Sequence, residues 1–172
     1  MSRASGLVLE IGLGTGLNLR HYTTAVNHLC AVEPDPHMRR RCAARISVAA
    51  VSVELCGASA EALPYDDGRF DDVVCTFTLC TIPDPVAALA EARRVLRPGG
   101  RLLFSEHVAS RGGAVRCVQG AVEPVWRRLA GGCHLTRSAT ILIEEAGFAL
   151  EECERRGARG SLMPLVWGVA RR

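Results

Sequence analysis

Short apolar runs alternate with helical patterns along the chain, and this alternation constrains the fold more than any other feature. Strands are expected at residues 6–11, 28–34, 51–57, 71–79 and 100–108. Helical patterns fall between them, at residues 17–26, 35–46 and 84–97. Buried strands that alternate with helices form parallel sheets covered on both faces. The pattern therefore predicts an α/β fold with helices on both faces of the sheet.

Two of the expected helices share a start signal. Asp35 and Asp84 are each followed by proline, which combines a good N-cap residue with one that suits the first helical position. The second of these helices is expected to stop at the "PGG" stretch, residues 98–100.

The last third of the chain has a different pattern. Residues 114–132 predict a helical excursion broken near Pro124, with Val118 and Leu129 on one apolar face that packs on the sheet or covers a ligand. A helix is expected over residues 136–147, with Thr136 as its N-cap. Residues 148–156 and 162–171 then form a closing strand pair.

Composition narrows the class of protein. A chain of 172 residues with 48% hydrophobic and 23% charged residues fits one globular domain over residues 1–172. A net charge of +3 does not favour nucleic acid as a partner. Glu10 interrupts any early apolar run, so neither a signal peptide nor a stable membrane anchor is expected, and the protein is predicted to be cytoplasmic.

The eight cysteines favour burial over metal binding. They include no CxxC pair, the close spacing that zinc sites usually use. Cys30, Cys56 and Cys75 lie in apolar runs, where cysteine acts as a small hydrophobic residue. The cysteines are expected to be reduced and mostly buried, and no metal is expected.

A glycine-rich stretch follows the first strand, with Gly12, Gly14 and Gly16 in alternate positions. A turn of this kind from a strand to a helix lets the backbone approach a ligand closely. The dinucleotide pattern GxGxxG fails because its third glycine would fall on Leu17. The P-loop also fails because no Gly-Lys-Ser/Thr follows.

Two acidic residues point to another ligand. Glu10 stands two residues before Gly12, where a carboxylate would repel a pyrophosphate and suit a cation. Glu33 ends the second strand, where it can accept hydrogen bonds from two ribose hydroxyls. Together they indicate a nucleoside that carries a positive tail.

The stretches "LEIGLGTG", "AVEPD", "GASAEALPYDDGRFDDVVCTFTL" and "RRVLRPGGRLLFSEH" resemble, in this order, the class I S-adenosylmethionine-dependent methyltransferases. The resemblance implies a Rossmann-like, mostly parallel sheet of seven strands with an antiparallel final strand. It implies S-adenosyl-L-methionine as cofactor. Ser59 stands where many relatives carry aspartate beside the adenine. The implied cofactor-binding residues are Glu10, Gly12, Gly14, Gly16, Glu33, Pro34, Ser59, Ala60, Glu61, Thr76 and Leu79.

The second half is similar to the thiol methyltransferases of animals, through "VVCTFTLCTI", "SEHVAS", "EPVWRRLAGGCHLTR" and "EEAGF". This resemblance implies methyl transfer to a small, lipophilic thiol, with residues 111–135 as a helical cap over the substrate. N, O and C acceptors stay open, because fold alone does not determine function.

His107 is the first candidate for a catalytic residue, since an imidazole at the carboxyl end of a strand can take the proton of a thiol. Glu106 is the second, as the group that orients His107 or bonds to the acceptor. The alternative is that the two simply cap the sheet. Cys80 is read as a pocket wall, and His134 and Arg137 reach either the pocket or the surface.

A rival hypothesis from another class is a binding or interaction protein on a methyltransferase fold. It is motivated by Ser59 and by the short segment ahead of Val8, where relatives carry a helix that covers the cofactor. An upstream start, or a homodimer whose partner chain supplies the lid, would reconcile that short segment with catalysis.

Overall fold

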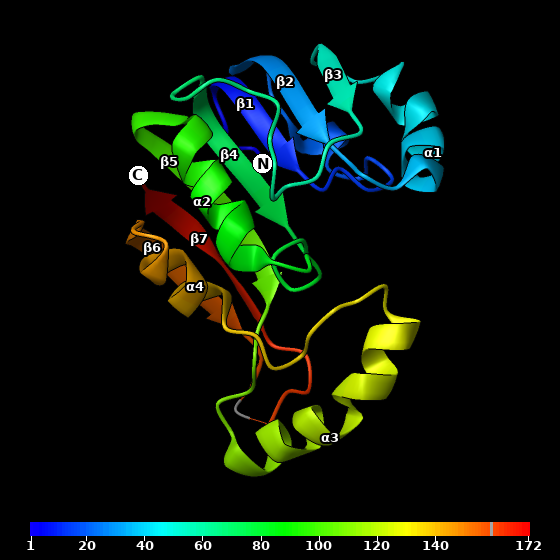
Figure 1. Ribbon diagram of the computed structural model, residues 1–172, viewed down its shortest axis with the longest axis vertical. Coiled ribbons are helices and arrows are strands. Elements are labelled where there is room, and N and C mark those ends of the chain that lie inside the picture. The colour runs from blue at the N-terminus through cyan, green and yellow to red at the C-terminus, as the bar shows by residue number, and fades with distance from the viewer. Residues whose placement is uncertain (159) are drawn as a thin grey trace.

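A twisted sheet forms the centre of the computed structural model, which describes residues 1–158 and 160–172 (Figure 1). In this part of the chain the sheet has seven strands in the order β3-β2-β1-β4-β5-β7-β6. The strands are β1 (Gly6–Ile11), β2 (Val26–Val32), β3 (Val53–Cys56), β4 (Phe70–Thr76), β5 (Leu96–His107), β6 (Ala149–Arg156) and β7 (Leu165–Arg171). The helices are η1 (Leu19–His21), α1 (Pro36–Ile46), α2 (Pro85–Val95), α3 (Gly113–Leu129) and α4 (Ala139–Glu145).

The direction of the strands confirms the predicted sheet. Strands β1 to β5 pair in parallel, whereas β7 lies antiparallel between β5 and β6. The chain progresses from β1 toward β3 on one side and from β4 toward β5 on the other, so the order reverses between β1 and β4. In open sheets of this kind, ligands bind outside the carboxyl ends of the strands at the reversal point.

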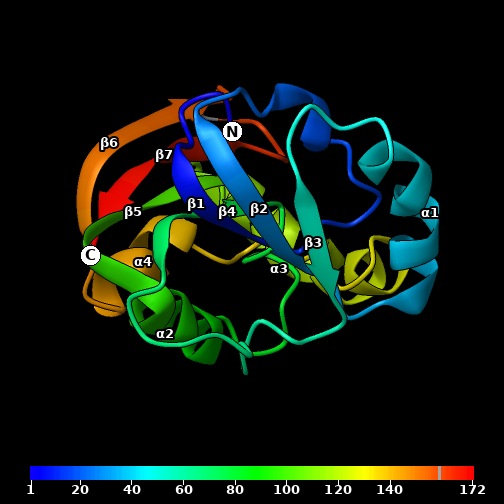
Figure 2. The ribbon, with the colours of Figure 1, turned by 90° about the horizontal axis from the view of Figure 1, so that it is seen from above.

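Helices cover both faces of the sheet, as predicted. On one face, Leu89 of α2 and Ile143 of α4 share a core with Leu9 and Phe104 of the strands. Figure 2 shows α2 and α4 side by side on that face. On the other, Leu19 of η1 and residues of α1 pack against alternate strand positions. The alternation follows from the strand period of two residues.

Both Asp-Pro signals start helices. The Asp35 side chain accepts from the backbone N–H of His37, and that of Asp84 accepts from the N–H groups of Val86 and Ala87. Helix α2 ends at Val95, before the predicted stop at residues 98–100, because the PGG stretch lies within β5 (Leu96–His107).

Three other expectations, about helix length, an N-cap and a helix break, are wrong. Residues 17–26 form only the short η1, because the side chains of Asn18 and Tyr22 are bonded to a buried carboxylate. The N-cap of α4 is Ser138 rather than Thr136, since the Thr136 hydroxyl and N–H both donate to Glu123. Helix α3 runs through Pro124 without a break.

Helix α3 stands away from the sheet (Figure 1). Along its fully described length Gln119 is the one buried residue. On the predicted apolar face Val118, Val122 and Leu129 are exposed, whereas Val115 and Trp126 are half-buried. Gln119 accepts from the N–H of Ser110 and donates to the carbonyl of Leu162. The helix is therefore attached by its ends and by the polar side chains of Gln119 and Glu123 rather than by an apolar face. Among the described residues, neither α3 nor another helix has the length and apolar character needed to cross a membrane.

Candidate functional site

A cavity of about 1170 Å³ opens at the carboxyl ends of β1, β2 and β4, where the strand order reverses. Its walls come from the segments 11–18, 32–38, 59–61, 76–83 and 127–137. Most of the predicted cofactor residues line it, namely Gly12, Gly14, Glu33, Pro34, Ser59, Ala60, Glu61 and Thr76. The other three, Glu10, Gly16 and Leu79, lie behind this wall.

The glycine turn is built from backbone that suits only glycine. Gly12, Gly14 and Gly16 have φ angles of 76°, 57° and 76°, in the left-handed region. A Cβ on Gly12 would lie 2.7 Å from the Thr78 hydroxyl oxygen, so β1 and the loop after β4 approach here without room for a side chain. A Cβ on Gly14 would meet nothing within 4 Å, because this residue faces the open cavity.

Glu33 holds the glycine turn against the end of β2. Its carboxylate accepts from the N–H of Gly14 at 2.8 Å and from that of Asp35 at 3.0 Å. It is 8% exposed and lines the cavity. A carboxylate oxygen can accept more than one hydrogen bond, so Glu33 keeps capacity for a ligand.

Glu10 lies one layer behind the cavity wall and is fully buried. Its carboxylate accepts from the Asn18 amide at 2.7 Å and from the Tyr22 hydroxyl at 2.9 Å. Burial raises the pKa of Glu10 to about 7, and these two hydrogen bonds limit the rise. Since Asn18 lines the cavity, Glu10 positions a wall residue.

Glu10 is expected to make the stability of the protein depend on pH. Its folded pKa lies above the ordinary value of 4.5, so the native state binds more protons between pH 4.5 and 7 and loses stability as the pH rises through this window. Relative to a Glu10→Gln variant, the native protein should lose roughly 2 kcal/mol between pH 5 and pH 7.5. Urea unfolding at both pH values measures this difference, and parallel profiles for the two proteins would contradict it.

The loop after β4 depends on Glu106. This residue is fully buried, and its carboxylate accepts from the N–H groups of Thr78, Leu79 and Cys80 at 2.9, 3.1 and 3.1 Å. Burial raises the pKa of Glu106. Neighbouring residues of a strand point to opposite faces, so Glu106 and His107 diverge. Glu106 thus supports the loop rather than orienting His107.

The loop itself is strained where it leaves β4. Phe77 has a φ of 53°, which is unusual for a bulky residue. This turn ends β4 at Thr76, whereas the sequence predicted a strand that ran to residue 79. The Phe77 ring lines the cavity and packs on the His107 ring at a centroid distance of 4.7 Å. His107 therefore lies behind Phe77, and its burial lowers the pKa of the imidazole.

The loop of residues 59–61 has its polar groups engaged with one another and with the start of α2. The Ser59 hydroxyl donates to the Glu61 carboxylate, which also accepts from the N–H of Asp84. Ala60 between them is buried.

His134 and Arg137 line the cavity, which decides the alternative that their sequence positions left open. His134 Nδ1 lies 3.1 Å from a carboxylate oxygen of Glu123, which projects from α3. Arg137 donates to the carbonyls of Leu79 and Ile82. Sequence reasoning missed Glu123, because its partners lie on another segment and no local pattern links them.

The strand order, the antiparallel β7 and the glycine-lined cavity define a Rossmann-like fold of the methyltransferase type. A solved S-adenosylmethionine-dependent methyltransferase from Mesorhizobium loti has a TM-score of 0.70 at 18% identity, over 98% of this chain and 92% of that chain. The [4+2]-cyclase SpnF has a TM-score of 0.79 at 20% identity, over 99% of this chain and 76% of that chain. Likeness at these identities shows the fold alone.

Sequence comparison identifies the family. The family described as a methyltransferase domain matches residues 9–104. Thiol S-methyltransferase TMT1B from Homo sapiens is 35% identical over 97% of this chain and 68% of that protein. The chain belongs to the S-adenosylmethionine-dependent methyltransferases. It spans between 62% and 68% of the length of the thiol S-methyltransferases that it matches.

Proposed function

We propose that the protein transfers a methyl group from S-adenosyl-L-methionine to a small, lipophilic thiol. The observation that carries the proposal is one continuous cavity with two unlike ends. The glycine turn and Glu33 form one end, and Phe77, Ile82 and the segment 127–137 form the other. The name and identity of the human thiol S-methyltransferase support a thiol over N, O and C acceptors.

The first end fits the cofactor. The space in front of Gly14 admits a ligand against the backbone, and the Glu33 carboxylate suits a ribose diol. We assign direct contacts to the cavity-lining members of the predicted set, with Ser59, Ala60 and Glu61 on the adenine side. Glu10, Gly16 and Leu79 act by holding these residues in place.

S-adenosyl-L-methionine supplies an activated methyl group, so the protein has to align the acceptor and exclude water. Phe77, Ile82 and Pro83 offer an apolar wall to a lipophilic acceptor. Residues 111–135 form the cap in this proposal, since Arg127, Gly131 and Gly132 border the cavity. Because Glu123 bonds to His134, it fastens α3 to the acceptor end.

We assign the proton of the thiol to His134 rather than to His107, which lies behind Phe77. With Nδ1–H donated to Glu123, the His134 Nε2 atom is an acceptor that a thiol can reach from the cavity. A free thiol with a pKa of about 8.5 needs only modest help to ionise.

The His134→Asn variant should therefore have a kcat/KM about 10- to 100-fold lower than that of the native protein at pH 7, and a much smaller loss at pH 9.

The binding step and the transfer step have separate tests. Titration calorimetry of the pure protein with S-adenosyl-L-methionine should give a saturable heat and a rise in Tm. Mass spectrometry after incubation with mixed thiols, amines and phenols should find thiols heavier by one CH2 group. Binding without any methylated product would support the rival view of a binding protein. The absence of heat and of a Tm shift at millimolar cofactor would refute the proposal.

A further inference from the structure

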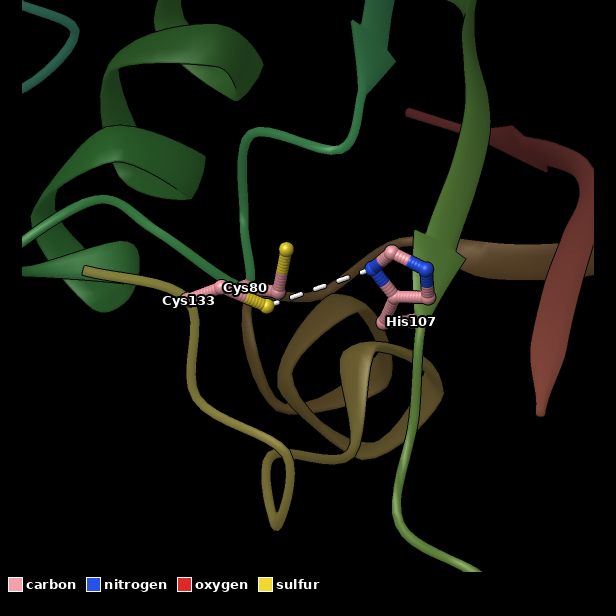
Figure 3. Close-up of side chains that lie close together, drawn as sticks. All are labelled: Cys80, His107 and Cys133. Carbon is pink, nitrogen blue, oxygen red and sulfur yellow. Dashed lines mark hydrogen bonds between the residues drawn. The ribbon is translucent and has the colours of Figure 1, made fainter. Parts of the chain in front are cut away.

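Three metal-ligating side chains converge beside the acceptor end of the cavity. Cys80 follows β4, His107 ends β5, and Cys133 lies between α3 and α4. Figure 3 shows the Cys133 thiol facing the His107 imidazole, with the Cys80 thiol beside them. Cys133 Sγ lies 3.9 Å from His107 Nδ1, and all three ligand atoms lie within 4.8 Å of one another.

The backbone holds the three side chains in this arrangement. The Cys80 N–H donates to Glu106 at 3.1 Å, and the Cys80 carbonyl accepts from the N–H of His134 at 2.7 Å. The second bond fastens the residue after Cys133 to Cys80. The His107 ring is held by its packing on Phe77. Cys80 and Cys133 are 2% and 6% exposed, so the thiols are shielded from bulk water.

The spacing fits a small tetrahedral ion. Bonds of about 2.3 Å to sulfur and about 2.0 Å to nitrogen place the two ligand atoms roughly 3.6 Å apart. The observed 3.9 Å between Cys133 Sγ and His107 Nδ1 needs only a small contraction. Two sulfur ligands and one imidazole select Zn²⁺ or Cu⁺ over the hard cations, which prefer oxygen.

The charges of such a site also balance. Two thiolates neutralise one divalent cation, and binding releases the two thiol protons to solvent. The charged groups beside the site are the Arg137 guanidinium, which already donates to two backbone carbonyls, and the Glu106 carboxyl group, which accepts from the Cys80 N–H.

We propose that Cys80, His107 and Cys133 form a binding site for a thiophilic d¹⁰ cation, with Zn²⁺ as its probe. Three protein ligands leave a fourth position for water or another small ligand. Thr81, Gly132 and His134 border the cavity, so the site lies directly behind its wall. The three ligands come from segments that are distant in sequence, so the search for closely spaced CxxC pairs did not reveal them. The proposal does not depend on methyl transfer.

The test uses the full chain, stripped of metal under reducing conditions. One equivalent of Zn²⁺ should bind in a competition titration with a chromophoric chelator. Co²⁺ should bind to the unaltered protein with a thiolate-to-metal charge-transfer band and the intense visible bands of a tetrahedral ion. This measurement needs no variant, so folding defects cannot disguise the result. Co²⁺ binding without those bands would overturn the proposal.

Variants locate the site. Cys80→Ser and Cys133→Ser should each weaken Zn²⁺ binding by more than the roughly 10- to 100-fold that is lost when a residue hydrogen-bonded to a metal ligand is changed. Cys117→Ser is the matched control, because Cys117 is an exposed thiol on α3. Equal affinity in the control and the cluster variants would overturn the proposal. So would a disulfide between Cys80 and Cys133, found by peptide mapping of the reoxidised protein, together with no metal uptake by the reduced protein.

Discussion

The Glu106→Ala substitution is expected to lower the free energy of unfolding by about 4–6 kcal/mol. The substitution leaves the N–H groups of Thr78, Leu79 and Cys80 without their buried acceptor. An unsatisfied buried donor costs about 1–3 kcal/mol, and three are released here. Urea unfolding monitored by circular dichroism measures the loss as a lower midpoint at an unchanged m-value.

Two controls separate this effect from the simple loss of a carboxylate. Glu106→Gln keeps one acceptor oxygen and should be less damaging than alanine. Glu154→Ala makes the same change at an exposed position of β6 and should cost less than about 0.5 kcal/mol. A loss below 1 kcal/mol for Glu106→Ala would show that the loop after β4 does not depend on this carboxylate.

The second large effect concerns cofactor binding. Under the proposed function, Glu33→Ala should weaken the affinity for S-adenosyl-L-methionine by at least about 100-fold. Glu33 would accept hydrogen bonds from two ribose hydroxyls. Each hydrogen bond to a charged acceptor contributes about 1.5–3 kcal/mol, and each 1.4 kcal/mol is tenfold in Kd. The variant also frees the N–H groups of Gly14 and Asp35, which loosens the turn that faces the ligand.

Titration calorimetry gives the two dissociation constants. Glu33→Gln retains an acceptor and should lose less affinity, whereas Glu154→Ala should bind as the native protein does. An unchanged Kd for Glu33→Ala would remove Glu33 from the binding site. A thermal unfolding curve for each variant ensures that a folded protein is being titrated.

The sequence alone predicted those structural elements that depend on local patterns of residues. The five parallel strands, the Asp-Pro helix starts and the left-handed glycine turn depend on residues next to one another in the sequence. The helix predicted at residues 17–26 does not form because the Asn18 and Tyr22 side chains donate hydrogen bonds to Glu10, which lies on β1. Predicted strand 71–79 ends early because Phe77 turns the chain.

The candidate site shows the same division. Glu33 was found because a strand-end carboxylate has a characteristic place in this fold. The sequence also singled out Glu10 and Glu106, but it did not predict their hydrogen-bond partners. Those partners depend on packing between strands and loops, which the spacing of residues in the sequence does not reveal. The contact of Glu123 with His134 and the cluster of Cys80, His107 and Cys133 likewise exist only after segments distant in sequence are brought together.

The loose attachment of α3 divides the chain into parts with different tolerance to mutation. Most residues of the central strands β1, β2 and β4 are buried between two layers, so most substitutions there would be selected against for stability alone. Helix α3 has Gln119 as its one buried residue along its described length, so its surface can vary at little cost to folding. Its far end borders the cavity. Under the proposed function this is the acceptor part, so changes in this helix would alter the range of accepted molecules while the cofactor end stays constant. A library randomised along α3 at positions other than Gln119 and Glu123 would therefore retain folded members, and it offers a starting point for directed evolution of acceptor choice.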